Sequence, residues 1–187
     1  MAKRPPGKLR IIGGEWRSRV IEFDNSGAVR PTPDRVRQTV FDWLAPIIEG
    51  ARCLDLFAGS GALGMEALSR GAAHCTFCET GARQVSLIKT SLVTLKAREH
   101  DVMMVDGIYY LAQTWHRYHV VFLDPPFGSD LVQRALEDLP KVLAPDSNRI
   151  YLEWTEGAKP GLPAGYSWLR EKQAGQVCFG LISYKHP

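Results

Sequence analysis

Residues 55–64, "DLFAGSGALG", carry glycines at positions 59, 61 and 64. This Gly-x-Gly-x-x-Gly spacing is typical of a turn that binds a nucleotide-like cofactor, but it is a weak signal unless a strand precedes it and a helix follows it. The apolar stretch "RCLDLF" before the glycines favours a strand, and "ALGMEALSRG" after them favours a helix. The sequence therefore predicts the turn, and the identity of its ligand depends on the rest of the chain.

The chain after residue 50 alternates between two patterns. Short apolar runs, "CTFCE", "VMMVD", "HVVFLD" and "RIYLEW", are separated by segments with helical spacing of apolar residues. This alternation is typical of βαβ units and predicts a mostly parallel sheet with helices on both faces. The last two segments, "YSWLREKQAG" and "QVCFGLISYK", predict an antiparallel hairpin at one edge of that sheet.

The first 50 residues have a different organisation. "KLRIIGGEWRSRVIEF" predicts a basic β-hairpin around Gly13 and Gly14. "RPTPDRVRQTVFDWLAP" predicts a helix that Thr32 caps, with Pro33 in its first turn and Pro46 at its end. We therefore expect residues 1–30 to form a hairpin extension and residues 31–187 to form one α/β unit.

Composition limits the classes to which the protein can belong. With 187 residues, 45% of them hydrophobic and 23% charged, the chain fits one soluble domain. It contains no apolar run of the ~18 residues that span a bilayer, and no apolar region follows the basic N-terminus, so we expect a cytoplasmic protein. The cysteines are expected to be buried and reduced, and Cys75 and Cys78 to point to opposite faces of a strand rather than to bind metal.

Charge is distributed unevenly along the chain. Residues 1–37 contain nine Lys or Arg and four acids, whereas the remainder contains fourteen Lys or Arg and sixteen acids. A basic N-terminal part on a slightly acidic body fits a polyanionic partner such as a nucleic acid. A solvated terminus with no partner explains the same charge equally well.

Four acids follow the predicted strands at or near their ends: Asp55, Glu79, Asp106 and Asp124. The carboxyl ends of parallel strands lie along one edge of a sheet, where ligands bind. Four acids at one place suit the cationic sulfonium and ammonium groups of S-adenosylmethionine better than the negative pyrophosphate of NAD. Glu79 also follows Gly59 by 20 residues, the usual distance to an acid that binds ribose. As an alternative, Asp55 and Asp106 only cap the turns that follow them.

The sharpest motif is "DPPF", residues 124–127. Two prolines stiffen the turn and remove two backbone donors, which leaves the Asp124 carboxylate and the Pro125 carbonyl as acceptors. Two such acceptors can hold the N–H groups of an exocyclic amine on a nucleobase, and Phe127 can stack on the base. A tight turn with no role in binding would also accommodate the two prolines.

Taken in order, "DLFAGSG", "FCE" and "DPPF" resemble a class I S-adenosylmethionine-dependent methyltransferase that acts on an exocyclic amine. The flanking stretches "RIIGGEWRSRVI", "RPTPDRVRQTVFDWL" and "DLFAGSGALGMEALSRGA" resemble the RsmD family, from about Leu9 to Phe127. That family methylates the 2-amino group of one guanine, of the guanine-966 type, in bacterial 16S ribosomal RNA. The resemblance implies a Rossmann-like, seven-stranded, mostly parallel sheet in a catalytic domain at 31–187, with helices on both faces, an antiparallel C-terminal hairpin and a preceding N-terminal β-hairpin.

The resemblance also implies roles for individual residues. Phe127 stands where Tyr is common, which keeps the stacking face and loses a hydroxyl. Catalysis is expected of Asp124, Pro125 and Phe127, and no metal is required. The residues expected to bind the S-adenosyl-L-methionine cofactor are Asp55, Phe57, Gly59, Gly61, Glu79 and Asp106. The residues expected to contact RNA are Arg10, Trp16, Arg17, Arg19, Arg30, Arg35 and Arg37.

The expected partner is 16S ribosomal RNA, in a partly or fully assembled small ribosomal subunit, and the protein is expected to be a monomer without membrane association. Packing under the hairpin is an alternative for Trp16, and a solvated helix face is one for Arg30, Arg35 and Arg37. The other functions that the sequence allows are a DNA adenine-N6 methyltransferase and a catalytically silent RNA-binding assembly factor. A chain of this length leaves no obvious substrate domain for an NAD-dependent oxidoreductase.

Overall fold

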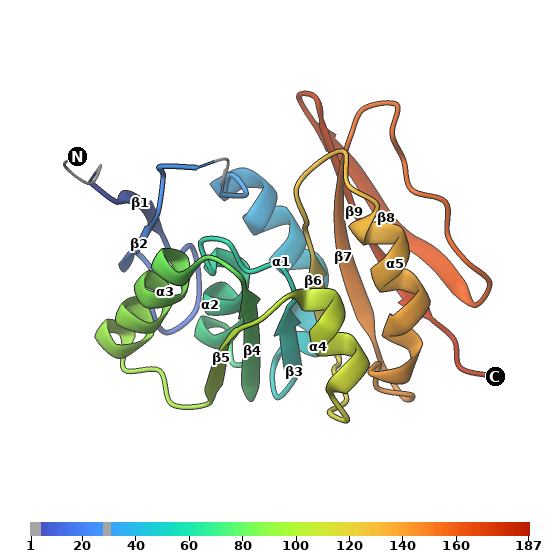
Figure 1. Ribbon diagram of the computed structural model, residues 1–187, viewed down its shortest axis with the longest axis horizontal. Helices are drawn as coiled ribbons and strands as arrows, with labels where there is room; N and C mark the ends of the chain where they lie inside the picture. The colour runs from blue at the N-terminus through green and yellow to red at the C-terminus, as the bar shows by residue number, and fades with distance from the viewer. Residues whose placement is uncertain (1–4, 28–30) are drawn as a thin grey trace.

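The computed structural model describes residues 5–27 and 31–187 and contains a seven-stranded sheet (Figure 1). Its strands are β3 (Arg52–Asp55), β4 (His74–Glu79), β5 (His100–Met104), β6 (Val120–Leu123), β7 (Arg149–Thr155), β8 (Tyr166–Ala174) and β9 (Val177–Tyr184). They lie in the order β5-β4-β3-β6-β7-β9-β8, with β3 to β7 parallel and β9 antiparallel to both of its neighbours. The predicted mostly parallel sheet with an antiparallel C-terminal hairpin is confirmed.

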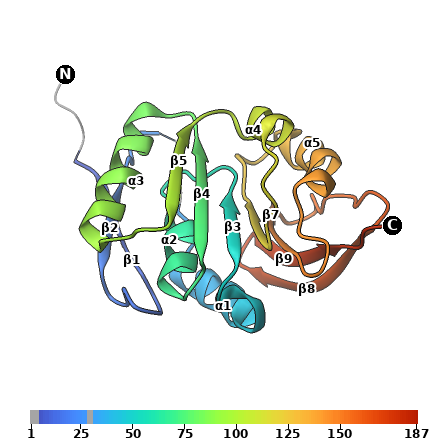
Figure 2. The same cartoon turned by 90° about the horizontal axis from the view of Figure 1, so that it is seen from below.

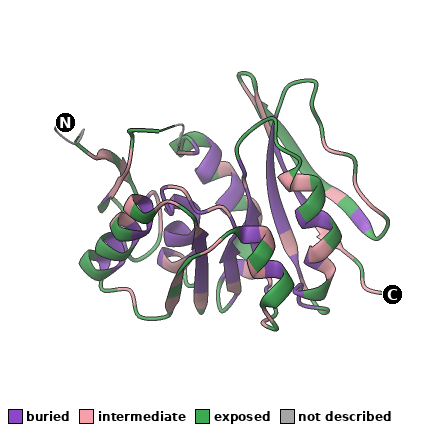
Figure 3. Ribbon diagram, viewed as in Figure 1, coloured by how far each residue is buried: buried purple, intermediate pink, exposed green. Residues whose placement is uncertain are grey.

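Helices cover both faces of this sheet (Figure 2). One face is covered by α1 (Asp34–Ile48), α2 (Ala62–Ser69) and α3 (Ala82–Leu95), and the other by α4 (Gly107–Gln113), α5 (Leu131–Asp138) and the 3-10 turn η1 (Leu139–Lys141). Each face has its own apolar cluster, and the central strands between the clusters are buried (Figure 3). Cys75 belongs to the first cluster and Cys78 to the second, which confirms that they point to opposite faces.

The N-terminal hairpin consists of β1 (Gly7–Arg10) and β2 (Val20–Phe23), paired antiparallel. It packs against α3 at the end of the molecule away from β8 and β9 (Figure 1). Three buried residues in and beside it, Ile11, Trp16 and Ile21, belong to the apolar cluster under α1, α2 and α3. The hairpin therefore shares the core of the α/β unit. The expected boundary at residue 30 lies outside the described residues.

The loop between β1 and β2 is attached to the C-terminal end of α2. The Ser69 carbonyl accepts a 2.7 Å hydrogen bond from the Glu15 N–H, and the Ser69 hydroxyl donates to the Gly13 carbonyl at 2.6 Å. Gly14 has a φ of 76°, and a Cβ there would lie 1.8 Å from the Ser69 carbonyl oxygen. A side chain at position 14 is therefore excluded both by the backbone conformation and by the close approach.

Two details of the predicted first helix are wrong. The hydroxyl of Thr32 does not cap α1; it donates a 2.9 Å hydrogen bond to Glu153 on β7, and Pro33 is the N-cap residue. The helix also continues past Pro46 to Ile48. Pro46 lacks the N–H that would donate to the Asp42 carbonyl, and the buried Ile48 holds the last turn in the core despite that loss.

Among the described residues, no helix has both the length and the apolar character needed to cross a membrane.

Candidate active site

The glycine loop lies between β3 and α2, as the sequence predicts. Its glycines are needed for different structural reasons. Gly59 and Gly61 have φ values of 52° and 73°, and Gly61 is the N-cap residue of α2. Gly64 lies in the helix, where a Cβ would come within 2.3 Å of the Phe77 ring on β4. The first two glycines therefore allow the turn, and the third allows close packing of helix on sheet.

Two of the predicted acids fix this loop. The Asp55 Oδ2 accepts a 3.0 Å hydrogen bond from the Gly64 N–H. The Glu79 carboxylate accepts from the Gly59 N–H at 2.8 Å and from the Gly81 N–H at 2.7 Å. Each carboxylate oxygen can accept a further hydrogen bond, so both acids can hold the loop and still bind a ligand.

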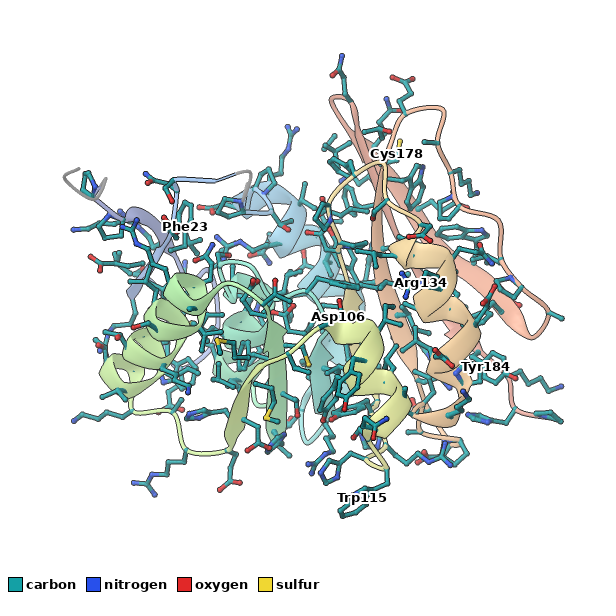
Figure 4. The ribbon with its side chains drawn as sticks, in the orientation of Figure 1. Phe23, Asp106, Trp115, Arg134, Cys178 and Tyr184 are labelled. Atoms are coloured by element: carbon teal, nitrogen blue, oxygen red, sulfur yellow. The ribbon has the colours of Figure 1, made fainter. Side chains whose placement is uncertain are left out.

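Asp106 is the N-cap residue of α4, and its carboxylate accepts a 2.9 Å hydrogen bond from the Tyr109 N–H. The capping that the alternative proposed for Asp106 is therefore present, at the start of a helix. Figure 4 shows Asp106 at the start of α4, with Trp115 beyond the far end of that helix. Asp106 is exposed, so its contact with a cofactor adenine stays a prediction.

The Asp-Pro-Pro-Phe turn directly follows β6. Asp124 is half-buried, Pro125 is buried, and Phe127 is 52% exposed. Gly128, with a φ of 78°, turns the chain back, and the Ser129 hydroxyl donates to the Pro126 carbonyl at 2.8 Å. The turn therefore presents one large aromatic ring to solvent beside a recessed carboxylate.

A carboxylate that sequence reasoning missed lies beside Asp124. Leu123 of β6 pairs with Leu152 of β7 in parallel register, so the next residues, Asp124 and Glu153, are also neighbours. Asp55 ends β3, the strand on the other side of β6. Together, Asp55, Asp124 and Glu153 form what we call the acidic edge. Glu153 could have been found, because it too is an acid near the end of an apolar strand.

All three residues of the acidic edge face α1, α2 and α3. Side chains two apart on a strand share a face, and Cys53, Phe122 and Tyr151, each two residues earlier, belong to the cluster on that side. In the described part of the chain, no Lys or Arg forms an ion pair with any of the three carboxylates. Three adjacent acids without a counter-cation make this edge a site for a positive or hydrogen-bond-donating ligand.

Burial and mutual repulsion perturb these acids. Burial, opposed by the Gly64 hydrogen bond and reinforced by Glu79, raises the pKa of Asp55 to about 8. Burial, followed by the repulsion from Glu153 and Asp55, raises the pKa of Asp124 well above its ordinary value. Burial also raises the pKa of Glu153, although the hydrogen bonds from Tyr151 and Thr32 oppose the rise. Burial and mutual repulsion therefore disfavour three negative charges at this edge, and a cationic ligand would favour them.

The predicted RNA-contacting residues divide into two groups. Trp16 is 7% exposed and packs in the core, which supports the packing alternative for this residue. Arg37 is 1% exposed and is enclosed by the Thr32 and Arg10 carbonyls and by the Asp34 and Glu66 carboxylates. Neither side chain is available to RNA in this conformation, which corrects the expectation that they face it.

The second group is exposed. Arg10, Arg17, Arg19 and Arg35 all have exposed side chains, and Arg19 also donates to the Thr94 carbonyl at 3.0 Å. Arg35 lines a groove between α1 and β8 together with Lys172. Arg30 lies outside the described residues. Arg35, at the start of α1, lies on the same side as the acidic edge, whereas Arg17 and Arg19 lie near the C-terminal ends of α2 and α3, at the amino ends of the strands.

The site fits S-adenosylmethionine on the chemistry of its donors and acceptors. Asp55 and Glu79 bring carboxylates to the glycine loop, and none of the ion pairs of the described residues involves either one or Asp106. An ammonium, a sulfonium, ribose hydroxyls and an amine all favour such acceptors. A pyrophosphate carries hydrogen-bond acceptors rather than donors, so it would not satisfy the lone pairs of these acids.

A family model described as "Conserved hypothetical protein 95" matches residues 9–183. The chain is 45% identical over 179 residues to the ribosomal RNA small subunit methyltransferase D of Escherichia coli strain K12, which covers 94% of this chain and 89% of that protein. The chain belongs to the RsmD family. The relative of the same name from Haemophilus influenzae is 42% identical over 182 residues, covering 94% of this chain and 93% of that one.

Solved structures of similar proteins agree with this placement in the RsmD family. A putative methyltransferase from Escherichia coli superposes with a TM-score of 0.89 at 42% identity, covering 97% of this chain and all of that one. A putative methylase from Haemophilus influenzae gives a TM-score of 0.82 at 36% identity, covering 96% of this chain and 100% of that one. The predicted class I methyltransferase fold is thereby confirmed.

Proposed function

We propose that this protein transfers a methyl group from S-adenosyl-L-methionine to the 2-amino group of a guanine in 16S ribosomal RNA. The observation that carries the proposal is the joint placement of the glycine loop and the Asp-Pro-Pro-Phe turn at the ends of neighbouring strands, β3 and β6. The names of the relatives support a ribosomal RNA substrate from the small subunit. The choice of the guanine 2-amino group rests on the family resemblance.

The cofactor would supply an electrophilic methyl group when bound. Asp55, Phe57, Gly59, Gly61 and Glu79 would hold it around the glycine loop, and Asp106 would accept a hydrogen bond from its adenine amine. The acidic character of this region supports S-adenosylmethionine over NAD. Because the glycine loop is already fixed by Asp55 and Glu79, little ordering is needed when the cofactor binds.

The target amine would lie against the Asp-Pro-Pro-Phe turn. Asp124 and the Pro125 carbonyl would accept its two N–H groups, and the exposed ring of Phe127 would stack on the base. This arrangement orients the nitrogen toward the incoming methyl group, so that catalysis consists mainly of positioning and of polarising the amine. Arg35 would bind a phosphate near the target base, and Arg10, Arg17 and Arg19 would bind phosphates farther along the RNA.

The test of this proposal is a product analysis. The protein is incubated with S-adenosylmethionine labelled in the methyl group and, separately, with isolated small ribosomal subunits, naked 16S ribosomal RNA and duplex DNA. Each nucleic acid is digested, and the labelled nucleoside is identified. We expect N2-methylguanosine from ribosomal RNA. N6-methyladenine from DNA would overturn the substrate, and no label in any arm would favour a silent RNA-binding factor.

The cofactor has an independent test in thermal unfolding. S-adenosylmethionine at a hundredfold excess over its dissociation constant should stabilise the protein by roughly 2.7 kcal/mol, whereas NAD should not. Glu79→Ala should reduce that stabilisation strongly, and Glu156→Ala, an exposed acid beyond β7, serves as the matched control. A larger stabilisation by NAD would refute the cofactor assignment.

A further inference from the structure

Glu153 is held in place by groups from two separate parts of the chain. The Tyr151 hydroxyl donates to its Oε1 at 2.5 Å, and the Thr32 hydroxyl donates to the same oxygen at 2.9 Å. Tyr151 is on the same strand, whereas Thr32 precedes α1, 121 residues away. All three side chains are buried. The hydrogen bonds from the two hydroxyls oppose the rise in the pKa of Glu153 that burial causes, so they favour its ionised form.

This buried carboxylate faces the residue that is expected to hold the target amine. Asp124 is its neighbour on β6, and Asp55 stands on the far side of Asp124. On β9, the residue paired with Glu153 is the uncharged Phe179. Among the described residues, the titratable or charged groups that face this pair are Asp55 from β3 and Tyr151 from β7, with the neutral Thr32 hydroxyl beside them. None of these groups neutralises a negative charge on Glu153.

We propose that Glu153, fixed by Thr32 and Tyr151, is a positioning residue that gives Asp124 the proton affinity to accept the proton released by the methylated amine. The inference rests on the proposed function and assigns the proton acceptor within the same site. The amine nitrogen forms the new N–C bond with its lone pair, and the bond from methyl to sulfur breaks with its electrons on sulfur. The nitrogen then carries an extra proton, which the Asp124 carboxylate takes up.

The charge on Glu153 makes that uptake favourable. A negative neighbour disfavours the ionised form of a carboxyl group, so an ionised Asp124 beside Glu153 is a stronger base than it would be alone. Two carboxyls that interact this closely also lose their protons in two coupled steps. Since Glu153 acts through Asp124 and does not touch the amine, its removal should change the pH dependence of the reaction more than the binding of RNA.

The direct test is the pH–rate profile of single-turnover methyl transfer to small ribosomal subunits. Activity requires ionised Asp124, so the rate should fall on the acid side as its pKa is crossed. In Glu153→Gln, we expect this acid limb to move to lower pH by roughly one unit, with a lower plateau and an unchanged KM for RNA. Glu153→Asp keeps the charge and should restore most of the wild-type profile, and Glu156→Gln should leave it unchanged.

An acid limb at the same pH in a folded Glu153→Gln variant would overturn the inference and leave Glu153 a structural residue. Where that variant fails to fold, the coupling is measured from the other side. In protein with 13C-labelled carboxyl groups, the titration midpoint of Glu153 should fall in Asp124→Asn relative to the wild type, and an unchanged midpoint would refute the coupling. Failure of the wild type to methylate RNA would instead refute the proposed function, because the carboxyl titration does not depend on activity.

Discussion

Buried charged groups occur in two different arrangements in this protein, one at the acidic edge and one in the network around Glu66. Glu66 on α2 is fully buried and is paired with Arg37 at 3.4 Å and Arg70 at 2.8 Å. Its carboxylate also accepts the N–H groups of Ile12 and Gly13 from the hairpin loop. Every charge in this network has a partner, so its residues join the hairpin, α1 and α2 into one structure.

The carboxyl groups of the acidic edge, by contrast, lie beside one another rather than beside cations. Asp55, Asp124 and Glu153 lie next to one another with no Lys or Arg paired to them in the described part of the chain. Unpaired like charges in a partly buried place cost stability, and such sites persist where a ligand supplies the missing charge. We infer from this comparison that buried charges with partners hold elements of this protein together, whereas buried charges without partners belong to the proposed active site.

At the acidic edge, the substitution with the largest expected effect is Asp124→Asn. Removing the carboxylate should lower the methyl-transfer rate by about 100- to 1000-fold, or ~2.7–4 kcal/mol, because the amine loses its charged acceptor. The fold and the thermal stabilisation by S-adenosylmethionine should be retained. Near-normal turnover would show that Asp124 has only a structural role in the turn.

The role of the network around Glu66 in stability is tested by Arg37→Met. Removing one partner of a buried ion pair leaves an uncompensated charge, and we expect the free energy of unfolding to fall by about 3 kcal/mol, since Arg70 still pairs with Glu66. Arg35→Met, an exposed change on the same helix, should stay within about 0.5 kcal/mol. Denaturant unfolding measures both variants, and equal effects would remove the distinction between the two arginines.

The acidic edge should also make the ligand-free protein sensitive to pH. The pKa of Asp55 is raised from 3.8 to about 8, so its contribution to stability is fully present below its unfolded pKa and is lost as the pH rises toward 8. The free energy of unfolding should therefore fall by about 1.4 kcal/mol per pH unit for this proton between pH 5 and 8.

Asp55→Asn should remove the contribution of one proton from the slope of the unfolding free energy against pH. Asp146→Asn, which changes an exposed acid just before β7, should leave the slope unchanged. Thermal or denaturant unfolding at several pH values measures the slope. If the slope is the same in Asp55→Asn and in the wild type, Asp55 is ionised throughout this range and its pKa is not raised.

The smallest expected effect concerns the exposed cations. Arg10→Ala with Arg17→Ala should reduce the slope of log affinity for RNA against log salt by about 1.4, because each phosphate contact contributes about 0.7 on single strands. Stabilisation by S-adenosylmethionine should not change. The control pair, Arg117→Ala with Lys141→Ala, lies beside η1 on the other face of the sheet and should leave the slope as it is. Matching slopes in the two double variants would place RNA elsewhere.

The sequence by itself determined the fold class and placed the main candidate site residues at one edge of the sheet. Alternating apolar runs and helical segments specified the parallel sheet, because a continuous apolar run fits a strand buried on both faces and helical spacing gives a helix one apolar face. The glycine spacing, Asp55, Glu79 and the Asp-Pro-Pro-Phe turn could be placed at one edge because the carboxyl ends of parallel strands meet there. These are local or periodic features, which neighbouring residues define.

Only the tertiary structure decided how individual charges are used. Arg35 and Arg37 are two residues apart in one basic stretch, yet the first is exposed and the second is enclosed by Glu66, Asp34 and two carbonyls. Thr32 reads as a helix cap, yet it donates to Glu153 on a distant strand. The free energy of a charge or a hydroxyl depends on what surrounds it in space, and those surroundings come from segments far apart in the chain.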